Sequence, residues 1–267
     1  MSVAHALRWG VSDTHTMVRR YVIGLTKTPE VLFFTTVQPV LFVLLFAGVF
    51  GGSIDAPGGN YAEYLMPGVF VQTAAFAIAV TGSAVALDVR RGVVDRFRSL
   101  PMAPTAVLAG RAVADLLLTT VSLAVLSGFG LLVGWQPHAG FPQVIAAYLV
   151  LLAFAFAVTW LGVYVGLVVR APEVASQASL FTVIPLVFLS NLYVPIDTLP
   201  GWVRPLAAWN PVSALVSTVR DLFGNSDRHI AESFPGRYPE LVALISIGLL
   251  LAVFVPLSVA KFHRADR

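Results

Sequence analysis

Six long apolar segments constrain the fold of this chain more than any other feature of its sequence. They lie at about residues 31–50, 64–87, 105–134, 144–169, 175–194 and 241–260. Each is near or above the roughly 20 residues that an α-helix needs to cross a bilayer. Charged residues make up only 12% of the chain, about half of their usual share in a soluble domain. The sequence therefore predicts an all-α integral membrane protein, with six transmembrane helices in a single domain over residues 1–267.

The positions of the basic residues predict how these segments are oriented in the membrane. Most of them fall on the cytoplasmic side if the N-terminus is cytoplasmic: Arg8, Arg19, Arg20, Lys27, Arg90, Arg91, Arg96, Arg98, Arg111, Arg170, Lys261, Arg264 and Arg267. The two short outer loops then carry none, and the remaining arginines lie in one long outer segment. The positive-inside rule therefore predicts a multi-pass protein with both termini in the cytoplasm. Because these residues act as orientation signals, the net charge of +3 does not indicate nucleic-acid binding.

Two amphipathic regions accompany the spans. The segment from Asp13 to Lys27 is predicted to be a helix that lies in the membrane interface. Between the fifth and sixth spans, short outer helices are predicted at Pro200–Ala208 and at Val212–Phe223, the second closed by Gly224. They are too short to span, so they either lie at the outer interface or enter the membrane and return. A loop anchored by tryptophans is an alternative for the same residues.

The stretch Leu87–Pro104, between the second and third spans, is short and basic. Read as a helix, it places Val93, Phe97 and Leu100 on one apolar face, because they recur at i, i+4 and i+7. Pro101 ends that helix, since proline cannot donate the amide that the helix requires. Such a helix could bind lipid headgroups or a soluble partner. A basic loop that only sets the topology is the alternative.

Together these features resemble the permease subunits of type-2 ABC export systems, in particular those like the daunorubicin-resistance permeases. The resemblance covers nearly the whole chain. The first cytoplasmic loop, from Arg91-Gly92 through Phe97 and Leu100 to Pro101, is similar to theirs. The segment between the last two spans shares a further pattern with them: Pro195, Leu199-Pro200, Trp202, Asn210-Pro211, Arg220 and Gly224.

The resemblance implies a division of labour between subunits. The chain has no GxxxxGK[ST] phosphate-binding loop, so a separate ABC ATPase would bind ATP and Mg and hydrolyse the ATP. This chain would bind no cofactor and catalyse no reaction by itself. The cytoplasmic coupling helix would dock on the ATPase through these residues: Arg90, Arg91, Val93, Val94, Phe97 and Leu100. Six spans are half a transporter in this family, so a second permease copy or a paralogue would complete it in the bacterial inner membrane.

The translocation path would then lie between paired permeases, lined mainly by the first, second and fifth spans. Its candidate lining residues are the polar ones in those spans: Gln38, Gln72, Ser176, Ser179 and Ser190. At 100° per residue of helix, the three serines lie within about 60° of one another. Hydrogen bonding between helices is the alternative role for each residue. Such a path suits an amphipathic drug-like or lipid-like substrate, taken from the membrane lipid, better than an ion.

Few residues in the spans indicate any other chemistry. Asp115 is the acidic residue nearest to a span centre, and an ion pair with Arg111 at i, i+4 is expected for it. No run of acidic residues typical of a proton- or sodium-driven carrier occurs in the spans. The absence of cysteine excludes disulfides and thiolate metal sites. A secondary carrier, and a membrane enzyme or assembly subunit without a transport function, remain the alternatives.

Overall fold

The computed structural model describes residues 3–50, 60–94, 104–169, 171–225 and 233–264, and no β-strand occurs in these ranges. The helices are α1 Val3–Thr26, α2 Pro29–Phe50, α3 Tyr61–Arg90, α5 Pro104–Val133, α6 Phe141–Val168, α7 Pro172–Phe188, the 3-10 helix η1 Ile196–Thr198, α8 Arg204–Ala208, α9 Pro211–Phe223, α10 Phe234–Arg237 and α11 Pro239–Arg264. The prediction of an all-α fold is therefore confirmed.

Five of the helices are long and apolar enough to cross a membrane, namely α2, α3, α5, α6 and α11. Their bounds agree closely with five of the six predicted segments. α7 has only 17 residues, fewer than a span usually requires. The predicted helical segment 175–194 is wrong in its last part, because α7 ends at Phe188 and the chain continues as irregular, mostly buried backbone.

The early end of α7 is explained by contacts with the start of α9. The side chain of Asn210, the N-cap of α9, donates hydrogen bonds to the carbonyl oxygens of Leu186 and Leu189 at 2.7 and 2.9 Å. The last carbonyl groups of a helix have no partner within it, so they need donors from elsewhere. Asn210 supplies them, and the chain can therefore leave the helix while buried.

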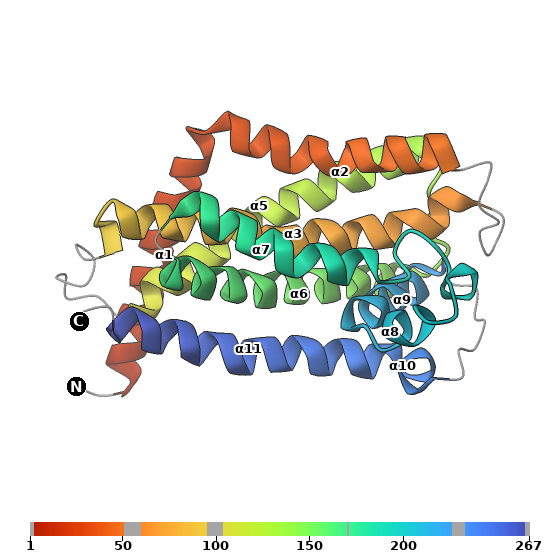
Figure 1. Cartoon of the computed structure of the whole chain (residues 1–267). Helices are drawn as coiled ribbons and strands as arrows, with labels where there is room; N and C mark the ends of the chain where they lie inside the picture. Colours follow the sequence, from red (N-terminus) through yellow and green to blue (C-terminus); the bar gives the residue numbers. More distant parts are fainter. Residues whose placement is uncertain (1–2, 51–59, 95–103, 170, 226–232, 265–267) are drawn as a thin grey trace.

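α3 and α6 form the centre of the bundle, with α2 and α11 on opposite sides of them (Figure 1). Two glycines of α6 allow α3 to approach closely. A Cβ atom on Gly162 would lie 2.8 Å from the carbonyl oxygen of Ile78, and one on Gly166 would lie 2.6 Å from that of Gly82. A larger residue at either place would push the two helices apart, as in other small-residue contacts between membrane helices.

The two ends of the bundle are covered differently (Figure 1). α1 crosses the end where the last turn of α11 also lies, whereas α8, α9 and α10 gather at the opposite end. α1 packs along α5, and its Met17 is 2% exposed in a cluster that includes Phe262 of α11. The predicted N-terminal helix is therefore present, but it begins at Val3 instead of Asp13.

Candidate translocation site and coupling region

The segment after α3 turns sharply before it becomes helical again. α3 continues through Arg90, Arg91 caps it, and Gly92 has a φ angle of 67°. Glycine adopts this left-handed conformation without strain. Arg90 and Arg91 therefore belong to the exposed end of α3, and the prediction of one helix running from Arg90 to Leu100 is wrong at its start. Nη1 of Arg90 lies 3.8 Å from Oε1 of Glu173, at the start of α7.

Val93 and Val94 begin the next helical turn and contact the permease itself. Val94 is 7% exposed in the cluster that contains Met17, and Val93 packs against the edge of that cluster. These side chains are thus partly used to anchor the segment, and the sequence pattern did not indicate this. Phe97 and Leu100 lie outside the described residues, and coupling to an ATPase stays a prediction.

A cavity of about 420 Å³ lies between α2, α3, α5 and α7. This volume is within the usual range for sites that hold small molecules. We call it the central cavity, and its lining includes Gln38, Phe42, Gln72, Phe76, Asp115 and Ser176. All four helices contribute polar side chains to its lining, although most of the lining surface is apolar.

The central cavity brings together three of the five predicted path residues, one each from α2, α3 and α7: Gln38, Gln72 and Ser176. Gln72 is 2% exposed, and its Oε1 accepts a hydrogen bond of 2.6 Å from the hydroxyl of Tyr193. The alternative role for Gln72 was hydrogen bonding between helices, but its partner Tyr193 lies in the irregular segment after α7. A role of these residues in transport stays a prediction.

The other two predicted path residues are not among those that line the cavity. Ser179 is buried against Gly82 of α3, and its hydroxyl donates to the carbonyl oxygen of Ala175 at 2.8 Å. Ser190 lies beyond the end of α7, where its hydroxyl donates to the carbonyl oxygen of Val187 at 2.6 Å. Because Ser190 is outside the helix, the predicted common helical face of the three serines is wrong.

The expected ion pair between Arg111 and Asp115 is confirmed. Nε of Arg111 donates to Oδ2 of Asp115 at 2.9 Å, and the hydroxyl of Thr81 donates to the same oxygen at 2.7 Å. The guanidinium carbon of Arg111 also lies 5.1 Å from the ring centroid of Tyr21 in α1. One carboxylate oxygen thus connects α3 and α5 directly, and Arg111 extends the connection to α1.

At the opposite end of the bundle, Arg220 of α9 is buried. Its guanidinium donates to the carbonyl oxygens of Tyr64, Asn191 and Leu192 at 3.0, 2.9 and 3.1 Å. Burial lowers the pKa of Arg220, and these three acceptors replace much of the hydration that the charge loses. Sequence reasoning placed Arg220 only among the outer basic residues and in the family pattern. Its position on the same helical face as the buried Val216 could have indicated its burial.

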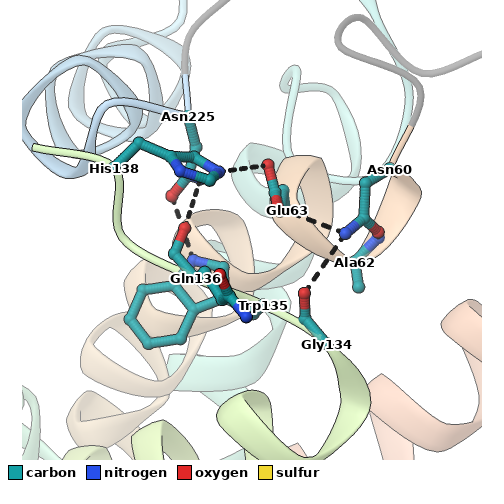
Figure 2. Close-up of polar contacts among 8 residues, drawn as sticks. All are labelled: Asn60, Ala62, Glu63, Gly134, Trp135, Gln136, His138 and Asn225. Carbon is teal, nitrogen blue, oxygen red and sulfur yellow. Dashed lines mark hydrogen bonds and ion pairs between the residues drawn. The ribbon is translucent and has the colours of Figure 1, made fainter.

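A polar cluster connects the loop between α5 and α6 to α3 and to the end of α9 (Figure 2). Nε2 of His138 lies 3.0 Å from Oε2 of Glu63, and Nε1 of Trp135 donates to Oδ1 of Asn225 at 3.0 Å. The amide of Asn60, the N-cap of α3, donates to the other carboxylate oxygen of Glu63 at 3.3 Å. The end of α9 is thus held against the loop after α5, and that loop against α3, by specific side-chain contacts.

Comparison with known proteins identifies the chain. Residues 12–223 match the family of ABC-2 type transporters. The chain is 35% identical over 256 residues to a daunorubicin resistance ABC transporter permease protein of Streptomyces coeruleorubidus. The aligned region covers 96% of this chain and 88% of that protein. It is 26% identical over 257 residues to a doxorubicin resistance ABC transporter permease protein of Mycobacterium tuberculosis, covering 92% and 88%. The chain therefore belongs to the ABC-2 type transporter family, as a membrane-embedded permease subunit.

Proposed function

We propose that this chain forms half of the membrane pathway of an ATP-driven exporter, and that its substrate is an amphipathic drug-like or lipid-like molecule. The central cavity carries the proposal, because it holds polar groups from four helices, three of which are long and apolar enough to cross a membrane. Relatives named for resistance to daunorubicin and doxorubicin support this class of substrate.

The proposed topology has six spans in the bacterial inner membrane. α7 is the fifth of these spans in chain order, and the buried segment that follows it completes the crossing. Irregular backbone is tolerated at membrane depth where protein surrounds it. Leu192 and Tyr193 of this segment are buried within the protein. α1 and both termini then lie on the cytoplasmic side, and α8 to α10 lie outside.

A separate ABC ATPase supplies the energy in this proposal and holds the ATP and Mg. Its docking site is the segment that begins after Gly92. The exposed Arg90 and Arg91 flank that segment, and the anchored Val93 and Val94 fix where it leaves the bundle. A force on the segment would thereby reach α3, which lines the central cavity.

A second permease copy or a paralogue packs against α2 and α7 in this proposal. α2 is the least buried of the five long helices, with 12% of its most apolar stretch buried, compared with 72% for α3. Its Gln38, close to the middle of the helix, is exposed, and an amide that faced lipid would be costly. Phe181 of α7 is 83% exposed. Cross-linking through Phe181→Cys should therefore join two permeases, whereas Leu244→Cys on α11 should not, and the reverse result would contradict this interface.

Uptake into inside-out vesicles tests the proposed function. Vesicles that contain the permease and its ABC ATPase partner should accumulate daunorubicin when ATP is present. Accumulation should stop when the ATPase is omitted or when ATP is replaced by an analogue that cannot be hydrolysed. Uptake driven by a proton or sodium gradient without the ATPase would instead identify a secondary carrier.

A further inference from the structure

The central cavity occupies only one half of the bundle. It begins beside Glu30, in the first turn of α2, and among the described residues that line it none lies farther along α2 than Phe42. α3 runs in the opposite direction (Figure 1), and its lining residue farthest from α1 is Gln72. Beyond that level, Val43 and Val69 are fully buried. The cavity therefore ends about midway along the helices, and packed side chains separate it from the end where α8, α9 and α10 lie.

Four aromatic rings pack together at this closed end, and we call them the aromatic stack. They belong to Phe42 and Phe46 of α2, Phe188 at the end of α7, and Tyr193 in the irregular segment that follows. The rings of Phe46 and Tyr193 have centroids 4.2 Å apart and an angle of 16° between their planes. The Phe42 ring lies 6.4 Å from that of Tyr193, and Phe42 also lines the cavity. The aromatic stack therefore borders the cavity at its closed end.

The two sides of the aromatic stack are held with different firmness. Tyr193 is 5% exposed, its hydroxyl donates to Oε1 of Gln72, and its carbonyl oxygen accepts a hydrogen bond of 3.0 Å from the hydroxyl of Tyr61. Phe42 and Phe46 are only partly buried, on the least buried of the five long helices. A helix with few buried contacts moves at a lower cost in free energy than one inside the core. Tyr193 is thus the fixed side, and α2 is the side that can move.

We propose that the aromatic stack is the outer gate of the central cavity, closed in this structure, and that substrate leaves when α2 separates from Tyr193. Aromatic pairs gain their free energy from apolar area and ring geometry, so they can separate and re-form without breaking a buried ion pair. Gln72 belongs to both parts, because it lines the cavity and holds the Tyr193 hydroxyl. This inference rests on the proposed export function and topology, and it assigns the residues that control release from the same cavity.

A cross-link across the gate tests the proposal. Phe46→Cys/Tyr193→Cys supplies the only two thiols of the chain. The purified permease is treated with a short bifunctional methanethiosulfonate reagent, the linked fraction is measured by mass spectrometry, and the protein is reconstituted with its ATPase. ATP-driven uptake of daunorubicin should fall in proportion to the linked fraction and should recover on reduction. Asp197→Cys/Arg204→Cys is the matched control, because these exposed residues are joined by a hydrogen bond within the outer segment, and linking them should leave uptake unchanged.

Opening the gate by substitution provides a second measurement, which does not depend on transport. Phe76→Cys places a single thiol at the cavity wall. In right-side-out membrane vesicles without ATP, an impermeant thiol reagent should react slowly with this thiol while the aromatic stack is intact. Adding Phe46→Ala should make the reaction about tenfold faster, the shift in the open population expected when one aromatic contact is lost. Leu44→Ala, which removes an exposed side chain of α2 outside the stack, is the control and should leave the reaction slow.

The outcomes separate the gate from the export function. Full uptake by the linked Phe46→Cys/Tyr193→Cys protein would overturn the gate, and so would equal labelling rates in the Phe46→Ala and Leu44→Ala backgrounds. Uptake by the wild-type complex would in either case leave the export function intact. Failure of the wild-type complex to transport daunorubicin would instead contradict the export function, and the labelling rates would then still decide whether the aromatic stack closes the cavity.

Discussion

The guanidinium carbon of Arg220 lies 3.6 Å from the centroid of the Tyr64 ring, and Nε of the same arginine donates to the Tyr64 carbonyl oxygen at 3.0 Å. The Tyr64 hydroxyl donates in turn to the carbonyl oxygen of Asn191 at 2.7 Å. The two residues therefore connect the first turns of α3 to the end of α9 and to the irregular segment after α7. A buried cation held by carbonyl oxygens and an aromatic face is well solvated only while all three elements stay together.

Replacing Arg220 should consequently destabilise the outer end of the bundle. Arg220→Gln leaves buried carbonyl oxygens without a charged donor, and a loss of roughly 1.5–3 kcal/mol is expected. Arg204→Gln is the control, because Arg204 also donates to backbone carbonyls but is exposed. Thermal unfolding in mild detergent should show a clear decrease for Arg220→Gln only. Equal unfolding temperatures for the two variants would contradict a structural role for the buried arginine.

The contact between α3 and α6 should be sensitive to a single methyl group. A Cβ atom on Gly166 would meet the Gly82 carbonyl oxygen and lie 2.7 Å from Cβ of Val85, so Gly166→Ala should cost about 1–3 kcal/mol by overpacking. Gly128→Ala in α5 is the matched control, since no atom lies within 4 Å of its added Cβ. The yield of monodisperse protein after mild heating measures the difference. A Gly166→Ala protein as heat-resistant as the control would show that the helices can separate freely.

The proposed topology can be tested directly because the chain contains no cysteine. Single cysteines at Trp202, which is 75% exposed in the outer segment, and at Glu173, at the start of α7, should report opposite sides. Trp202→Cys should react with an impermeant thiol reagent in intact cells, and Glu173→Cys only after the cells are opened. Reaction of Glu173→Cys from outside would reverse the orientation.

The coupling segment should affect the ATPase without affecting the fold of the permease. Phe97→Asp should weaken association with the ATPase by more than about a hundredfold, because losing a packed phenylalanine costs about 3 kcal/mol and an unpaired charge adds to that. Arg98→Ala should change association little, since solvated ion pairs contribute about 0–1 kcal/mol. Co-purification at equal membrane abundance is the measurement. Retention of the ATPase by Phe97→Asp would leave the segment as a loop that only sets topology.

The long helices could be predicted from the sequence because membrane length and apolar composition act locally, residue by residue. The end of α7 could not, because it depends on donors from Asn210, which lies 21 residues beyond Leu189. The position of Ser190 could not be predicted for the same reason. Its predicted place on a helical face assumed that the helix continues, whereas Asn210 satisfies the last carbonyl groups of α7 and the helix ends.

The cavity could be predicted only in part. Polarity within an apolar span indicated Gln38, Gln72 and Ser176, which the fold brings together. Polarity also indicated Ser179, which instead bonds to the backbone of its own helix. The pairing of Asp115 with Arg111 could be predicted because it is a local i, i+4 pattern. The hydrogen bond from Thr81 to Asp115 could not, because Thr81 lies in another helix.

The central claim is that substrate passes through the cavity, and blocking the cavity after folding tests it most directly. Ser176→Cys places the chain's single thiol at the cavity wall, and Leu244→Cys places it on the exposed side of α11. Each permease is treated with a bulky methanethiosulfonate reagent before the ATPase is added, and ATP-driven uptake of daunorubicin is then measured. Modification at Ser176→Cys should remove most of the uptake, reduction should restore it, and modification at Leu244→Cys should have little effect. Full uptake by the modified Ser176→Cys protein would mean that substrate takes another route.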